Sequence, residues 1–162
     1  MKPFATRFES PLGPMVLVSD GTALTGLYFD GQKHFPADTS GWRWDATAAP
    51  FPRVTHQLAV YFAGRRLAFD LPLAPAGTAF QLRVWRQLAA IPHGATCTYS
   101  DVAIAMGSPA AVRAVGAAVG RNPLSILVPC HRVLGRGGAL TGYAGGLERK
   151  AALLGLEGAG KS

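Results

Sequence analysis

Residues 101–119 of this 162-residue chain read DVAIAMGSPAAVRAVGAAV, and this stretch decides how the second half folds. It has the layout of two short helices joined by a turn that contains Gly107 and Pro109, which is a helix-turn-helix arrangement. The second helix is rich in small residues and carries one long cation, Arg113. Such a helix can lie close to a groove wall while Arg113 reaches phosphates or bases. Two ordinary helices whose alanines pack at a tight crossing are the alternative.

Charge is distributed unevenly between the two halves of the chain. Residues 1–78 carry seven Lys and Arg against six Asp and Glu, whereas residues 79–162 carry nine against three. The net charges are therefore +1 and +6, which together give the +7 of the whole chain. A basic second half favours a polyanionic partner for that half, and a generally basic soluble protein is the alternative.

The regions around this stretch predict two domains. Residues 1–70 read as an N-terminal α/β domain and residues 77–160 as a C-terminal, mainly helical domain, with the boundary in residues 65–77. Alternating apolar residues and Pro–Gly turns predict strands in the first thirty residues, and Thr78 is the predicted N-cap of a helix. The expected elements are strands over 4–9, 15–19, 24–29 and 124–128, and helices over 54–62, 78–90, 110–119 and 147–156, with a further helix that begins at Tyr99 or Ser100 and ends at Met106.

Composition argues against several classes of protein. Two cysteines, Cys97 and Cys130, give no disulfide framework and fit a reducing compartment. The cysteines and histidines show no metal-ligand spacing, so we expect no metal. No apolar run reaches about eighteen residues, and the N-terminal segment lacks the apolar core of a secretion signal. The aromatic residues expected to anchor packing are Trp42, Trp44 and Trp85.

Residues 129–133, which read PCHRV, are the sharpest chemical signal in the chain. A thiolate is a strong nucleophile, and its formation needs a base within hydrogen-bond reach of the thiol. His131 can take the proton from Cys130, and Glu157 can orient His131 by accepting from its other ring nitrogen. Adjacent side chains of a strand point to opposite faces, so this pairing requires a turn at Cys130 or a bridging water. A buried cysteine that only fills space is the alternative.

Taken together, these motifs resemble the O6-alkylguanine-DNA alkyltransferase (methylated-DNA–protein-cysteine methyltransferase) family. The PCHRV run looks like the family signature, and the resemblance is nearly continuous over residues 56–158. Residues 10–14 carry a looser resemblance in the first part of the chain. The fold class that this resemblance implies is α/β, with a small N-terminal α/β (ribonuclease H-like) domain and a C-terminal, mainly helical domain that contains a winged-type helix-turn-helix. The implied activity is that of a methylated-DNA–[protein]-cysteine S-methyltransferase, an enzyme that acts once.

The resemblance also implies roles for individual residues. Cys130 looks like the alkyl acceptor, and His131 and Glu157 look like the pair that relays its proton through a water. Asn122 is similar to the family's hinge asparagine and is grouped with these catalytic residues. The implied DNA-binding residues are Tyr99, Arg113, Ala114 and Arg121. The implied guanine pocket is formed by Tyr99, Val133, Tyr143, Ala144 and Gly145.

Two of these residues have a mechanical role in the family. Arg113 resembles the finger that fills the gap in the base stack, and Tyr99 resembles the residue that pushes on the target phosphate. Two positions depart from some relatives: Ala144 stands where these have Ser, and Ser125 stands where they have Pro. The second departure leaves the tolerated alkyl size open. The glycine-rich residues 135–146 lack a phosphate-loop pattern and are expected to form a flexible wall beside Cys130.

The partner that the resemblance implies is double-stranded DNA containing O6-alkylguanine, bound through the minor groove. O4-alkylthymine is a further candidate substrate, and cooperative binding is left open. We expect a cytoplasmic monomer with no cofactor and no membrane association. Two alternatives remain: a non-catalytic alkyltransferase-like lesion binder, which carries another residue at the Cys130 position, and a Cys-His-Glu hydrolase, which would turn over. A plain transcriptional regulator would leave the PCHRV run unexplained.

Overall fold

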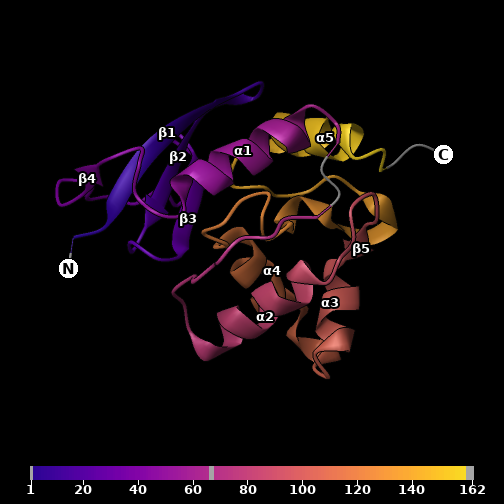
Figure 1. The fold of residues 1–162 in the computed structure, drawn as a ribbon. Coiled ribbons are helices and arrows are strands. Elements are labelled where there is room, and N and C mark those ends of the chain that lie inside the picture. Colours follow the sequence, from indigo (N-terminus) through magenta and orange to yellow (C-terminus); the bar gives the residue numbers. More distant parts are fainter. Residues whose placement is uncertain (1, 66–67, 160–162) are drawn as a thin grey trace. The chain divides into compact units, whose positions relative to one another are not determined.

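The computed structural model describes residues 2–65 and 68–159 (Figure 1). The chain divides into two compact units, an N-terminal unit of residues 1–76 and a C-terminal unit of residues 77–162. Within the described ranges, no helix combines the length and the apolar composition needed to cross a membrane. Every residue that the sequence singles out for chemistry belongs to the C-terminal unit.

The N-terminal unit is built on a four-stranded sheet with the strand order β3-β2-β1-β4. Its elements are β1 (Phe4–Ser10), β2 (Gly13–Ser19), β3 (Leu24–Phe29), β4 (Arg43–Trp44) and the helix α1 (Phe51–Phe62). β2 pairs antiparallel with both β1 and β3, and β4 joins β1 in parallel. The three strands predicted in this region are confirmed, and the predicted helix begins at Phe51, three residues earlier than expected.

One face of this sheet is covered by α1. Val54, Leu58 and Tyr61 are buried and recur with the spacing of an amphipathic helix. The ring of Phe62 at the end of α1 stacks on Phe8 of β1, with the ring centroids 6.3 Å apart. The apolar stripe of α1 and the alternating apolar residues of the strands therefore supply one side of the core.

Aromatic residues run from one edge of the sheet to the other. Edge-to-face contacts join Tyr28 to Phe35, Phe35 to Trp42 and Trp42 to Trp44, with centroid separations of 5.5, 6.3 and 6.0 Å. Trp44 thus packs on Trp42, as expected of a packing anchor, but it is 53% exposed. The reason is its position on β4, a two-residue edge strand whose residues are both exposed.

The C-terminal unit is mainly helical. Its elements are α2 (Ala79–Ala89), β5 (Cys97–Thr98), α3 (Tyr99–Ala105), α4 (Val112–Gly120), β6 (Val133–Leu134), α5 (Leu147–Leu156) and the short 3₁₀ turns η1 (Pro109–Ala111), η2 (Cys130–Arg132) and η3 (Arg136–Gly138). Thr78 and Thr98 begin α2 and α3 with capping boxes, which explains why both helices start where the sequence predicts. The four helices predicted in this unit are confirmed, with η1 forming the first turn of the third.

The helix-turn-helix that the sequence predicts is formed by α3, η1 and α4. Gly107 follows α3 with φ +75°, in the left-handed region that favours glycine, and so lets the chain turn. Val115 and Val119 of α4 are buried, and α4 packs against α2. Trp85 of α2 is 3% exposed and its indole Nε1 donates to the backbone oxygen of Ala118 at 2.8 Å. Trp85 thus has the anchoring role expected of it.

Residues 124–128 correct a prediction, because they form consecutive tight turns and no strand. The backbone N–H of Val128 donates to the oxygen of Leu124 at 2.9 Å, and Ile126 has φ +73°. All five residues are buried, so the apolar run reflects complete burial and carries no periodicity that distinguishes a strand from a buried turn.

A substitution at Gly77, directly before Thr78, tests how tightly Trp85 of α2 is packed. A Cβ at this position would lie 2.6 and 2.7 Å from ring atoms of the buried Trp85. We expect Gly77→Ala to lower the free energy of unfolding by about 1–3 kcal/mol, because Trp85 is held by its hydrogen bond and cannot move freely. Urea unfolding measures the change. Gly155→Ala in α5, where a Cβ meets nothing within 4 Å, is the matched control and should be neutral or stabilising. Equal effects of the two variants would contradict the expectation.

Candidate active site

Cys130 lies at the first position of η2, a 3₁₀ turn. The backbone N–H of Cys130 donates to the oxygen of Val128 at 2.8 Å, and that of Arg132 donates to the oxygen of Pro129 at 3.0 Å. The residue is 5% exposed. The turn that the sequence requires at Cys130 is present, but no hydrogen bond joins its thiol to Nδ1 of His131, which has no partner among the described residues.

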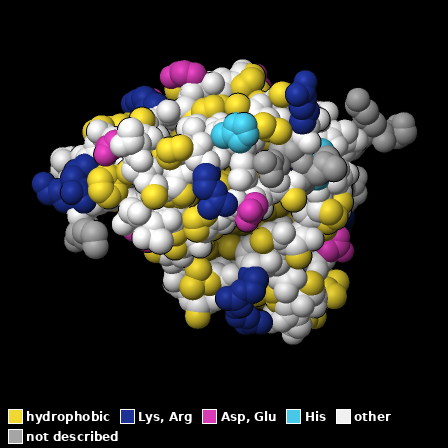
Figure 2. Space-filling model, in the orientation of Figure 1, with side chains coloured by type: hydrophobic (Ala, Val, Ile, Leu, Met, Phe, Trp, Pro, Cys, Tyr) yellow, Lys and Arg dark blue, Asp and Glu magenta, His cyan; other side chains and the backbone are white. Residues whose placement is uncertain are grey.

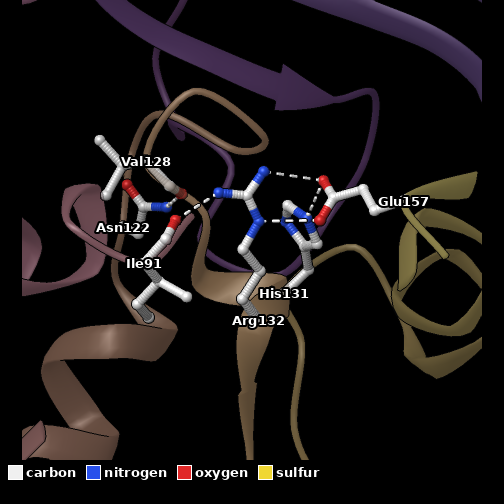
Figure 3. Close-up of polar contacts among 6 residues, drawn as sticks. All are labelled: Ile91, Asn122, Val128, His131, Arg132 and Glu157. Carbon is white, nitrogen blue, oxygen red and sulfur yellow. Dashed lines mark hydrogen bonds and ion pairs between the residues drawn. The ribbon is translucent and has the colours of Figure 1, made fainter. Parts of the chain in front are cut away.

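His131 and Glu157 form a fully buried pair. The Nε2 of His131 lies 2.7 Å from Oε2 of Glu157, and neither side chain is exposed (Figure 3). A carboxylate can only accept, so Nε2 carries the hydrogen and Nδ1 carries a lone pair. Nδ1 is buried and has no hydrogen-bond partner among the described residues. The ring therefore has one nitrogen that is fixed and one that can accept a proton.

Burial sets the protonation state of His131. Burial is the largest influence and lowers the pKa of His131, while the hydrogen bond and charge of Glu157 raise it. The charges of Arg132 and Lys150 act in the same direction as burial. The lowered pKa keeps the imidazole neutral at pH 7, which is the form that can act as a base.

Asn122 joins the end of α4 to the segment that leads into Cys130. Its Nδ2 donates to the backbone oxygen of Val128 at 2.7 Å, and its Oδ1 accepts from the N–H of Leu124 at 3.0 Å. The side chain is buried, so these bonds are shielded from water. The Asn122 amide is also one of the influences that lower the pKa of the Cys130 thiol.

Opposing influences set the acidity of Cys130. Burial is the largest and raises the pKa of the thiol, whereas the hydrogen bond from Asn122 and the charge of Lys150 lower it. The raised pKa means that the thiol is the resting form and that a base is needed to make the thiolate. The neutral imidazole of His131, held by the buried carboxylate of Glu157, is a group that can act as such a base.

Two buried charged residues of this cluster were given no role by the sequence. Arg132 donates from Nε to Oε1 of Glu157 at 2.8 Å and from Nη2 to Oε2 at 3.0 Å. Lys150 is fully buried and its Nζ donates to the backbone oxygens of Thr141 and Gly142 at 2.6 and 3.0 Å. Helical spacing could have indicated that Lys150 is buried, because it lies on the same face of α5 as the buried Leu153, Leu154 and Glu157.

Tyr99 and Tyr143 lie around the same buried groups. The hydroxyl of Tyr99 donates to the backbone oxygen of Thr141 at 3.3 Å, and Nζ of Lys150 is 5.9 Å from the Tyr99 ring centroid. Burial raises the pKa of Tyr143 well above its ordinary value, and the negative charge of a Cys130 thiolate acts in the same direction. The acidity of Tyr143 therefore depends on the charge state of Cys130.

The remaining pocket candidates differ in their surroundings. Val133 is fully buried on β6, directly after η2, where it pairs with Cys97 of β5. Gly145 is buried and its backbone oxygen accepts from Nη1 of Arg149 at 3.2 Å, and Ala144 beside it is half-buried. The turn and the loop thus provide backbone groups near the tyrosines.

The DNA-binding candidates other than Tyr99 lie outside this buried cluster. Arg113 and Ala114 are exposed on α4, and Arg121 is exposed directly after it. Arg113 lies in the first turn of α4 and Arg121 directly follows its last residue, so the two exposed cations lie at opposite ends of this helix. A Cβ on Gly116 of α4 would lie 3.9 Å from the Tyr99 ring, so the helix approaches the buried site there. On the face drawn in Figure 2, Lys and Arg side chains stand in separate groups and form no continuous patch.

No trio of His, Cys, Asp and Glu side chains within the described residues could hold a metal ion. Both cysteines are free thiols.

Lys150 provides a pH-dependent test of the thiol's environment. Burial lowers the pKa of Lys150 to about 8, so its charge is present below pH 8 and lost above it. We expect Lys150→Met to slow the reaction of Cys130 with iodoacetamide about tenfold at pH 7, as a rise of one unit in the pKa of the thiol would do. The difference should shrink above pH 8, where the wild-type lysine is also neutral. Peptide mass spectrometry follows each thiol, and Cys97 in the same samples is the control. An unchanged Cys130 rate at pH 7 would contradict the expectation.

Comparison with known proteins connects this geometry to one family. Residues 79–159 match the family model described as 6-O-methylguanine DNA methyltransferase, DNA binding domain, and residues 4–75 match the one described as its ribonuclease-like domain. The methylated-DNA–protein-cysteine methyltransferase of Mycobacterium tuberculosis is 47% identical over 149 residues, covering 92% of this chain and 88% of that protein. The corresponding protein of Methanosarcina acetivorans is 48% identical over 152 residues, covering 93% and 96%.

Solved structures agree with this relationship. A crystal structure of Mycobacterium tuberculosis OGT in complex with DNA is similar with a TM-score of 0.88 and 44% identity, covering 96% of this chain and 92% of that one. A Methanococcus jannaschii O6-methylguanine DNA methyltransferase shares the fold at 23% identity and a TM-score of 0.65. The expected fold class, a small N-terminal α/β domain followed by a mainly helical DNA-binding domain, is confirmed. The chain therefore belongs to the methylated-DNA–protein-cysteine methyltransferase family.

Proposed function

We propose that this chain repairs alkylated DNA by direct reversal, moving the alkyl group from O6 of guanine to Sγ of Cys130. The observation that carries the proposal is the buried pair beside Cys130, in which Nε2 of His131 lies 2.7 Å from Glu157 and Nδ1 stays without a partner among the described residues. Relatives that are 47–48% identical are named methylated-DNA–protein-cysteine methyltransferases. Their names and this geometry point to the same chemistry.

The bonds, charges and protons of the alkyl transfer balance without an added reagent. Nδ1 of His131 takes the proton of the Cys130 thiol, through one water as the resemblance implies, and Glu157 stabilises the imidazolium that forms. Sγ then bonds to the alkyl carbon as the bond from that carbon to O6 breaks, and the electron pair stays on the base. The proton held by His131 passes to the guanine, so the products are a neutral guanine and an S-alkylcysteine.

The base must leave the duplex before this reaction can occur. The alkyl carbon lies at the base edge, where stacking obstructs an in-line approach, so the nucleotide has to rotate into a pocket at a cost of a few kcal/mol. Arg113, exposed on α4, is proposed to fill the vacated position in the stack. Tyr99 is proposed to press on the target phosphate. The small exposed Ala114 allows α4 to lie in the minor groove, and Arg121 binds the backbone.

The guanine pocket is proposed to consist of Tyr99, Tyr143 and the backbone of residues 133, 144 and 145. Two observations support this: the negative charge of a Cys130 thiolate raises the pKa of Tyr143, and the Tyr99 hydroxyl donates to the backbone oxygen of Thr141. Residues 77–160 then serve as the DNA-binding and alkyl-acceptor domain, and residues 1–70 serve as a structural domain. We propose a monomer that acts in the cytoplasm on double-stranded DNA. Its two free thiols are consistent with a reducing compartment.

The product is a thioether, which has no ready route to hydrolysis, so each molecule acts once. Incubation with excess O6-methylguanine duplex should transfer one methyl group per molecule, and peptide mass spectrometry should find it on Cys130. Cys130→Ser should transfer none while still binding the duplex. Sustained turnover would support the hydrolase alternative, and binding without a mass change in the wild type would support a lesion binder. Either result would overturn the proposal.

A further inference from the structure

Arg132 belongs to the buried cluster but has no part in the proton path described above. Its side chain is 8% exposed, and all three of its nitrogens donate (Figure 3). Nε and Nη2 contact the two carboxylate oxygens of Glu157, and Nη1 donates to the backbone oxygen of Ile91 at 2.6 Å. One guanidinium thus joins η2 to the segment after α2 and to the end of α5.

Glu157 needs such support because of where it lies. It is the C-cap residue of α5, at the helix end where the dipole disfavours a negative charge. Its side chain is also fully buried, and a buried carboxylate without donors favours its protonated form. The planar fork of an arginine matches both oxygens of a carboxylate at once, which fixes its orientation as well as its charge.

We propose that Arg132 is a positioning residue for the alkyl transfer: its two-point contact fixes Glu157, and Glu157 in turn fixes His131 with Nδ1 free to take the thiol proton. Oε2 of Glu157 is the shared atom, because it accepts from Nη2 of Arg132 at 3.0 Å and from Nε2 of His131 at 2.7 Å. This inference rests on the proposed function, since it assigns Arg132 a task within that reaction.

The charge of Arg132 alone does not explain its presence. Arg132 lowers the pKa of His131, which weakens the imidazole as a base, whereas Glu157 raises that pKa. A positive charge placed here without the fork geometry would therefore oppose the proton transfer. The benefit of Arg132 lies in the orientation that it gives to Glu157, and a lysine with the same charge and a single nitrogen should not replace it.

The decisive variant is Arg132→Lys, assayed for single-turnover alkyl transfer on an O6-methylguanine duplex. We expect the transfer rate to fall about 10- to 100-fold, as loss of a group that orients a reacting residue commonly does, with the affinity for the duplex unchanged. Arg53→Lys is the matched control, because Arg53 also contacts a backbone oxygen and a carboxylate, but on the surface of the N-terminal unit. That variant should match the wild type.

A double-variant comparison separates positioning from a structural role. If Arg132 acts through His131, adding Arg132→Lys to His131→Phe causes no further loss of rate. A wild-type rate in Arg132→Lys, or the same fold loss in the His131→Phe background, overturns the inference.

Nitrogen-15 spectra of labelled histidine give a second measurement. The wild-type His131 should show a hydrogen on Nε2 only, and Arg132→Lys should show a mixture of the two neutral forms. A wild-type spectrum in the variant overturns the inference. Arg132→Gln is measured in parallel, so that a folded variant is compared if the lysine disrupts packing. A wild type that transfers no alkyl group would instead overturn the proposed function, and the spectra would still test the contact.

Discussion

We expect His131→Phe to lower the single-turnover rate of alkyl transfer by about 10²- to 10⁴-fold at pH 7, the range expected for loss of a general base. Phenylalanine keeps the volume of the buried ring and removes the nitrogen that accepts the thiol proton. Because burial raises the pKa of Cys130, the thiolate cannot form readily without that base. Rapid-quench sampling of a labelled O6-methylguanine duplex measures the rate.

Raising the pH should restore part of the lost rate, because hydroxide can then remove the proton in place of His131. The recovery should continue above the ordinary range of a thiol, in the direction of the raised pKa of Cys130. His56→Phe, which changes an exposed histidine of α1, is the control and should match the wild type. A variant at position 131 with the wild-type rate at pH 7 would show that another group takes the proton.

Glu157→Ala should lower the free energy of unfolding of the C-terminal unit by about 3–5 kcal/mol, because it leaves a buried charge without its partner. The charge in question is that of Arg132, whose side chain is 8% exposed and which loses two of its three acceptor contacts. His131 loses its acceptor at the same time. Urea unfolding provides the free energy.

The control for this variant is Glu148→Ala, which removes an exposed carboxylate from the first turn of the same helix. Its effect should stay below about 1 kcal/mol, the usual worth of a favourable charge at a helix N-terminus. Trp85 reports on the C-terminal unit when Trp42 and Trp44 of the N-terminal unit are replaced by phenylalanine. Similar losses for the two glutamates would mean that Arg132 finds another partner or becomes solvated.

Much of the fold follows from local signals in the sequence. The helix over 147–156 and the capped start at Thr78 were predictable, because periodicity and capping act within a few residues. The turns formed by residues 124–128 were not predictable, because a fully buried run of residues has no polar face that would reveal the period of a helix or a strand. The exposure of Trp44 depends on how short β4 is, which propensity does not specify.

Some residues of the candidate site were also predictable from the sequence, and others were not. The pairing of His131 with Glu157 could be anticipated from the chemistry of a thiol that needs a base. The burial of Arg132 and Lys150 could not be anticipated from the sequence. Charged side chains are usually exposed, and only the tertiary structure supplies the acceptors of these two. Both acceptors of Lys150 and one of the three acceptors of Arg132 are backbone oxygens, of residues 141, 142 and 91, and such partners do not depend on the identity of the residues that supply them.

The amide of Asn122 has a mechanical consequence. Nine residues separate α4 from Cys130 along the chain. Asn122 shortens this connection, because its Nδ2 donates at 2.7 Å to the backbone oxygen of Val128, two residues before Cys130. A flexible loop would absorb a displacement of α4, whereas this short hydrogen-bonded link would transmit it to the residues before Cys130. The end of α4 and the turn that carries Cys130 are thus joined by a short hydrogen-bonded link, and we expect a displacement of one to reach the other.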